Sequence, residues 1–114
     1  MYGIVFYRRI FRLIWVLKYK ISTTIIGLSS DPRKYFYTVA KGVGISWTEL
    51  VGRLNIYIDI QVIAAENHPI YDQAIAGLNK WYNMEGNKAT TARLLQALHD
   101  IGKSNVVDDI REQR

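Results

Sequence analysis

The sequence GISWTEL, residues 44–50, has the pattern of the first turn of a helix. Ser46 can accept a hydrogen bond from the backbone N–H of Glu49, and the Glu49 carboxylate can accept one from the N–H of Ser46, which makes a capping box. Ile45 and Leu50 flank the pair at the positions where a hydrophobic staple closes. The stretch therefore predicts a helix that begins at Ser46, and this start fixes the direction of the tryptophan that follows.

On both sides of this turn, apolar residues recur at steps of three and four, which is typical of helices with one buried face. Asp31-Pro32 marks the first helix start, and Gly86 and Gly102 mark helix ends. No segment after residue 31 alternates like a strand. We expect an all-α domain with helices at about residues 32–42, 46–54, 58–66, 70–85, 90–101 and 104–110.

Each expected helix has an apolar face that must pack against the others. Trp47 and Trp81 are the largest candidates for the shared core, because each indole can bury roughly 150–250 Å². The full set of residues predicted to form the structural core is Ile45, Trp47, Leu50, Leu54, Ile60, Ile63, Leu78, Trp81, Leu95, Leu98, Ile101, Val107 and Ile110.

The charge of the chain is unevenly placed. The 114 residues carry a net charge of +5 and no cysteine, so disulfides and cysteine-based metal sites are excluded. Residues 1–30 hold five cations and no acid, whereas residues 31–114 hold ten Lys or Arg and ten Asp or Glu. The basic excess therefore describes the N-terminal segment and not the domain, which argues against nucleic acid as a partner. The absence of cysteine favours a cytoplasmic location.

Three segments carry a resemblance that goes beyond periodicity: GISWTELVGRLNI from residue 44, IAAENHP from residue 63, and LNKWYNMEGNKATTARLLQALHDIGKSNVVDDI from residue 78. The Ile-Ser-Trp start, the Glu-Asn pair before Pro69, Trp81 near the end of the long helix and the leucine run after Thr90 stand in the right order and spacing. Over about residues 36–111 the chain resembles a death domain, most of all the death domain of ankyrins, which are spectrin-binding adaptors of the membrane skeleton.

The resemblance implies a six-helix antiparallel bundle of the death-fold type over residues 31–114. It also implies a non-enzymatic protein-interaction module in signal transduction, apoptosis or the cytoskeleton. Its expected partners are other death-fold domains, neighbouring domains of an ankyrin-like protein, or further copies of the chain. Some features depart from the family pattern, among them short linkers on both sides of the helix expected at about residues 58–66. The turn Ile56-Tyr57-Ile58 is unusually apolar, and Gly77 lies inside the longest helix at a cost of roughly 1 kcal/mol relative to Ala.

Residues 1–30 form a separate N-terminal segment. Drawn as a helix, the segment is amphipathic and basic, which is typical of helices that lie on an anionic membrane surface. Its uncharged runs are too short to span a bilayer, and its cations interrupt the apolar stretch that a secretory signal needs. A mitochondrial presequence, a helix packed on the bundle and a mis-assigned start that does not fold remain as alternatives. The candidate membrane contacts are Arg8, Arg9, Arg12, Lys18 and Lys20.

No constellation in the sequence supports catalysis, a metal or a cofactor. His68 and His99 are far apart, and neither has a His or Cys neighbour at ligand spacing. Asp108-Asp109 and Glu112 have the pattern of a solvated helix face, and the Ser46 hydroxyl is expected to cap a helix. We therefore expect a chain that is not an enzyme, with no cofactor.

Surface charge is the remaining functional signal. Small helical adaptors recognise one another through patches of opposite sign, which set specificity and association rate. The candidate partner-binding residues are Arg53, Asp59, Glu66, Lys80, Arg93 and Asp100. Such a module would lie in the cytoplasm, with the membrane periphery or membrane skeleton as a narrower alternative. A second function remains open, in which the basic N-terminal helix targets the module to a membrane surface.

Overall fold

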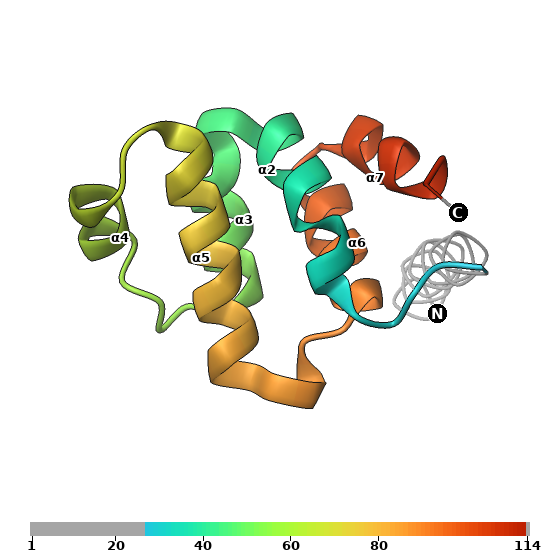
Figure 1. Cartoon of the computed structure of the whole chain (residues 1–114), viewed down its shortest axis with the longest axis horizontal. Helices are drawn as coiled ribbons and strands as arrows, with labels where there is room; N and C mark the ends of the chain where they lie inside the picture. The colour runs from blue at the N-terminus through green and yellow to red at the C-terminus, as the bar shows by residue number, and fades with distance from the viewer. Residues whose placement is uncertain (1–26, 114) are drawn as a thin grey trace, which may run out of the picture.

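The computed structural model describes residues 27–113, and the regular structure within them is entirely helical. This confirms the all-α prediction. These residues form six α-helices and three short 3-10 helices (Figure 1). In chain order they are η1 (Pro32–Tyr35), α2 (Phe36–Val43), η2 (Gly44–Ser46), α3 (Trp47–Leu54), α4 (Ile60–Glu66), α5 (Ile70–Glu85), η3 (Gly86–Lys88), α6 (Thr91–Asp100) and α7 (Ser104–Arg111).

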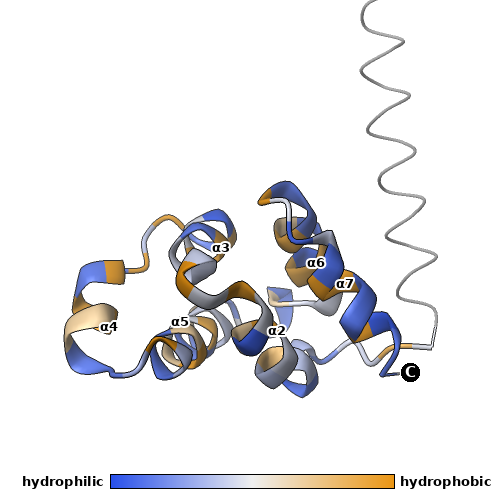
Figure 2. Ribbon diagram, turned by 90° about the horizontal axis from the view of Figure 1, so that it is seen from above, coloured by the Kyte–Doolittle hydropathy of each residue, from blue (hydrophilic) through white to orange (hydrophobic). Residues whose placement is uncertain are grey.

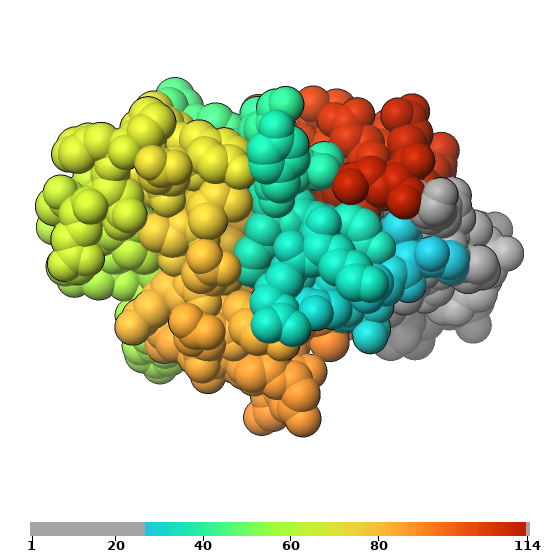
Figure 3. All heavy atoms as spheres, in the orientation of Figure 1, coloured from blue at the N-terminus to red at the C-terminus, as the bar shows by residue number. Residues whose placement is uncertain are grey.

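Helix α5 is the centre of the arrangement. It packs against α2 and α3 along much of its length and carries α4 on its outer side. Helices α6 and α7 complete the bundle, with α6 against α3 and α7 against α2. Figure 2 shows α4 at one edge of the bundle and α7 toward the opposite side. In Figure 3, α2 and α5 lie side by side on the visible face.

The two indoles lie in the interior, with Trp47 2% and Trp81 0% exposed. Phe36 packs on Trp81 with ring centroids 6.4 Å apart. Most of the other residues predicted to form the core are also buried, namely Leu50, Leu54, Ile63, Leu78, Leu95, Leu98, Val107 and Ile110. Ile60 and Ile101 are half-buried and pack against the edge of the core.

The predicted capping box is wrong, and so is the placement of Ile45 in the core. Ser46 has φ −71° and ψ 0°, which is already helical, and its side chain makes no capping hydrogen bond. A capping serine needs extended backbone to turn its oxygen toward the helix start, and η2 removes that geometry. Ile45 lies in the same turn and is 73% exposed. The chain instead turns at Gly44, whose φ of +53° suits glycine.

Gly77 is buried at the crossing of α5 and α3. A Cβ placed there would lie 2.8 Å from Val51 Cγ2 and 3.3 Å from the Trp47 ring. The unfavourable glycine is therefore the residue that lets α3 approach α5 closely.

A side-chain amide links α3 and α5 to the loop between α4 and α5. Trp47 Nε1 donates to Gln73 Oε1 at 3.1 Å, and Gln73 Nε2 donates to the Asn67 carbonyl at 3.0 Å. Asn67 Nδ2 in turn donates to the Ile63 carbonyl at 2.8 Å. The start of α4 is fixed by Asp59, which accepts from the Val62 N–H at 3.1 Å.

The first described residues are tied to the bundle. Thr91 donates from its hydroxyl to the Ser29 carbonyl at 2.7 Å, and the Ser29 N–H donates to the Tyr35 hydroxyl at 2.8 Å. Thr90, beside it, caps α6. No helix within residues 27–113 has both the length and the apolarity to cross a bilayer. The candidate membrane contacts Arg8, Arg9, Arg12, Lys18 and Lys20 lie outside the described residues.

Candidate interaction surface

Three of the six candidate partner-binding residues line one groove. Arg53 at the end of α3 and Arg93 and Asp100 on α6 lie around a hollow of about 140 Å³, which we call the α3–α6 groove. Its other lining residues are Leu54, Gln96 and Ala97. The sequence placed these residues on two helices, and the packing of α6 on α3 brings them together.

Arg93 is engaged inside the fold. Its guanidinium pairs with Glu85 on α5 and donates to the Leu54 carbonyl at 2.9 Å. The guanidinium carbon also lies 5.9 Å from the centre of the Trp81 ring. Because these contacts join three helices, Arg93 holds the groove together, and its side chain remains 42% exposed.

Arg53 and Asp100 supply the exposed charge of the groove. Both residues are exposed, and the Asp100 carboxylate accepts from Gln96 Nε2 at 2.9 Å. A groove with one guanidinium and one carboxylate can recognise a partner that presents the two charges in reverse order.

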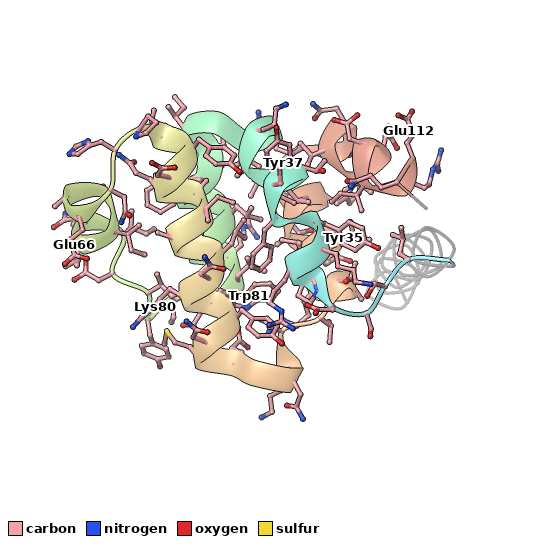
Figure 4. The ribbon with its side chains drawn as sticks, viewed as in Figure 1. Tyr35, Tyr37, Glu66, Lys80, Trp81 and Glu112 are labelled. Carbon is pink, nitrogen blue, oxygen red and sulfur yellow. The ribbon has the colours of Figure 1, made fainter. Side chains whose placement is uncertain are left out.

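The other three candidates lie away from the groove. Asp59 and Glu66 are exposed at the two ends of α4, and Figure 4 shows Glu66 at the outer edge of the molecule. Lys80 points outward from α5 in the same view. The six residues therefore do not form a single patch.

A second charged cluster, formed by Asp31 and Arg33 at the start of η1, was not predicted from the sequence. Arg33 donates to both carboxylate oxygens of Asp31 and lies 4.5 Å above the Tyr82 ring. The hydrogen bonds from the Arg33 side chain and then from its backbone N–H hold the pKa of Asp31 below its usual value. The same carboxylate raises the pKa of Arg33. The pattern Asp-Pro-Arg was the available signal, since it places a cation two residues after a capping aspartate.

The two histidines, His68 and His99, lie in different parts of the fold. His68 is exposed in the loop before α5, whereas His99 is half-buried with Nδ1 3.1 Å from Ser104 Oγ. In the part of the chain from residue 27 to 113, no three His, Cys, Asp or Glu side chains are grouped so that they could hold a metal ion.

A sequence profile of the family described as "Death domain" matches residues 33–114. The chain belongs to the death-domain family. It is similar to ankyrin-3 of Mus musculus, with 38% identity over 71 residues, which is 60% of this chain and 4% of that protein. Ankyrin-1 of Mus musculus is 34% identical over 98 residues, or 81% of this chain and 5% of that protein. Ankyrin-1 of Homo sapiens is 33% identical over 72 residues.

These matches confirm the resemblance to the death domain of ankyrins. The chain spans only about a twentieth of the length of these relatives. Because the match to mouse ankyrin-1 covers 81% of the chain, it also takes in residues upstream of residue 33. Death domains are non-catalytic interaction modules, so the chain is not an enzyme.

Proposed function

We propose that this death domain binds another death-fold domain, or a neighbouring domain of an ankyrin-like protein, through the α3–α6 groove. The observation that carries the proposal is the groove itself, where the exposed charges of Arg53 and Asp100 stand beside apolar Leu54 and Ala97. Charged groups around a small apolar floor give an interface its register and exclude wrong partners.

The groove is built on a rigid support. Arg93 and Trp81 fix the approach of α3, α5 and α6, and the groove lies on their outer side. A preorganised surface loses little conformational entropy when it binds. This is the property expected of a module whose function is recognition.

Charge reversal tests the proposal. We expect Arg53→Glu and Asp100→Lys each to weaken capture by purified death-fold or ankyrin-derived domains by about tenfold. Both residues are exposed, so circular dichroism should show an unchanged fold. Lys88→Glu is the matched control, because Lys88 is exposed on η3 outside the groove. Undiminished capture by the variant with both reversals would exclude the groove.

The similarity to ankyrins supports a cytoplasmic role at the membrane skeleton over one in apoptosis. A chain that co-sediments with the membrane skeleton of cells, and is released by Arg53→Glu, would fit this location. A uniform cytosolic distribution would contradict it.

A second function is membrane targeting by residues 1–30. The five cations and absent acids of that segment favour it. Liposomes that contain anionic lipid should sediment with the full chain and not with a chain that lacks residues 1–26. Equal sedimentation of the two forms would exclude this function.

A further inference from the structure

The exposed apolar residues of the domain gather around helix α4. Seven large apolar side chains are exposed among residues 27–113, and four of the seven lie between residues 56 and 70. These four are Ile56, Tyr57, Val62 and Ile70, of which Ile56 is 79% and Tyr57 82% exposed. Apolar residues that gather on a surface mark an interaction site, whereas single ones need no explanation. We call residues 55–73 the α4 end, and Figure 2 shows α4 at the edge of the bundle.

The charged side chains of the α4 end are all acidic. Asp59, Glu66 and Asp72 are exposed, and no Lys or Arg lies between Leu54 and Asn79. None of the three carboxylates forms an ion pair with any residue from 27 to 113. Because an anionic membrane would be repelled by these charges, the surface fits a protein segment that is both basic and apolar.

Apolar and acidic residues share one side of α4. Asp59 caps the helix at its start, and Glu66 is its last residue. Val62 lies three residues after Asp59 and four before Glu66, so the three side chains are on one face. The exposed apolar residues just before and just after the helix continue this surface at its two ends.

The N-terminal segment of the same chain has the complementary pattern. Residues 1–26 lie outside the described residues and hold five cations and no acid. Drawn as a helix, the segment has Arg9, Lys18 and Lys20 at the borders of its apolar side. The apolar side itself consists of Phe6, Tyr7, Ile10, Leu13, Ile14 and Leu17.

We propose that residues 1–26 fold back and bind the α4 end of their own chain. The apolar side of the segment packs on the exposed apolar residues of the α4 end, and the bordering cations lie beside the three carboxylates. Burial of apolar surface supplies the affinity, and the opposite charges set the orientation of the segment.

The segment is long enough for this contact. It joins the domain at Gly27, and α2 leads from there to the start of α5, where the Tyr37 and Tyr71 rings are 5.8 Å apart. The ten residue steps from Leu17 to Gly27 span about 33 Å when extended, and a helix from Phe6 to Leu17 adds about 17 Å. These lengths together approach 53 Å, the longest dimension of the fold.

The tether favours contact within one chain. A segment joined by a short linker is present at its site at an effective concentration of about 1 mM, which exceeds that of a second copy in dilute solution. While it is docked, the segment is withheld from a membrane surface.

The α4 end shares no residue with the α3–α6 groove. Failure of the groove in capture experiments and failure of the fold-back contact are therefore separate results.

Paramagnetic broadening of NMR signals in the full chain tests the inference. The chain has no cysteine, so a nitroxide can be attached at the single site Ala65→Cys on the exposed side of α4. We expect the label to broaden the amide signals of residues 6–17. In a mixture of nitroxide-labelled chain with unlabelled, isotope-enriched chain, the enriched signals should stay sharp.

Two pairs of substitutions should release the segment. Ile56→Ser/Tyr57→Ser removes apolar surface, and Glu66→Lys/Asp72→Lys reverses two charges. We expect each pair to weaken the fold-back equilibrium by about tenfold and to sharpen the signals of residues 6–17. All four positions are exposed, so circular dichroism should show an unchanged fold. Asp59 is left unchanged because it caps α4.

Asp108→Lys/Asp109→Lys is the matched control, since it makes the same change of charge on the exposed side of α7. The segment should stay docked in this variant. Sharp signals in the labelled chain without further substitutions, or broadening that survives both pairs at the α4 end, would overturn the inference. Equal release by the α7 control would overturn it as well. Broadening in the mixture would show binding to a second copy and would exclude the fold-back contact.

Discussion

Helices α4 and α6 have the same apolar periodicity in the sequence but different places in the fold. Helix α4 buries one residue, Ile63, whereas half of α6 is buried, namely Thr91, Leu94, Leu95, Ala97 and Leu98. Helix α6 packs on both α3 and α7, while α4 rests mainly on α5 at the edge of the bundle. A helical period therefore predicts a helix but not its contribution to stability. Helix α6 is part of the cooperative core, whereas α4 can open locally.

The largest expected effect lies in the core. Trp81→Ala should lower the free energy of unfolding by about 3–5 kcal/mol, because the indole is completely buried. Ile63→Ala, at the inner face of α4, should cost about 2 kcal/mol or less. Urea denaturation measures both. A loss below roughly 1 kcal/mol for Trp81→Ala, or equal losses for the two variants, would remove the distinction between the regions.

Arg93 links α6 to the end of α3 and to α5. Arg93→Met should lower the free energy of unfolding by about 1–3 kcal/mol, because the Leu54 carbonyl loses its donor and Glu85 its charge partner. Chemical denaturation should show this loss. Lys88→Met on exposed η3 is the control, expected within about 0.5 kcal/mol of the natural chain. A harmless Arg93→Met would show that the three contacts contribute nothing.

Two glycines sharpen the comparison further. Gly77→Ala should destabilise the domain by about 1 kcal/mol, since the clash with buried Val51 outweighs the gain in helix propensity. Gly52→Ala on α3 is the matched change, because its Cβ would meet Ile60 of α4 at an ordinary 4.0 Å. This variant should gain up to about 1 kcal/mol. Thermal melts of both variants should shift in opposite directions, and shifts of the same sign would contradict the packing described at α3 and α5.

The smallest effect concerns pH. The folded pKa of Asp31 lies below its unfolded value, so its contribution to stability is present above the unfolded pKa and is lost as pH falls through the folded pKa. The free energy of unfolding should therefore decline below about pH 4 slightly more in the natural chain than in Asp31→Asn. Parallel pH profiles for the two proteins would show that the Asp31–Arg33 pair is not formed in solution.

Much of this fold was predictable from the sequence. The apolar periodicity indicates which face each helix buries, and the capping residues, prolines and glycines indicate where the helices begin and end. These patterns predicted the burial of Trp47 and Trp81 and the helix starts at Asp31 and Thr90. The capping box at Ser46 failed because a 3-10 turn, which has no distinct sequence pattern, occupies its position.

The candidate surface was less predictable than the fold. Charge and helix position identified Arg53 and Asp100, but only tertiary contacts show that they share a groove and that Arg93 is engaged within the fold. The hydrogen bonds of Gln73 with Trp47 and Asn67, and the close contact of α3 with α5 at Gly77, depend on long-range packing. Local sequence does not encode that packing.

Native-state hydrogen exchange tests the division between core and edge most directly. The account predicts that amides of α5 and α6 exchange only through global unfolding, while those of α4 exchange through an opening that costs at least about 2 kcal/mol less. Amides of α4 that are protected as strongly as those of α5 would contradict it.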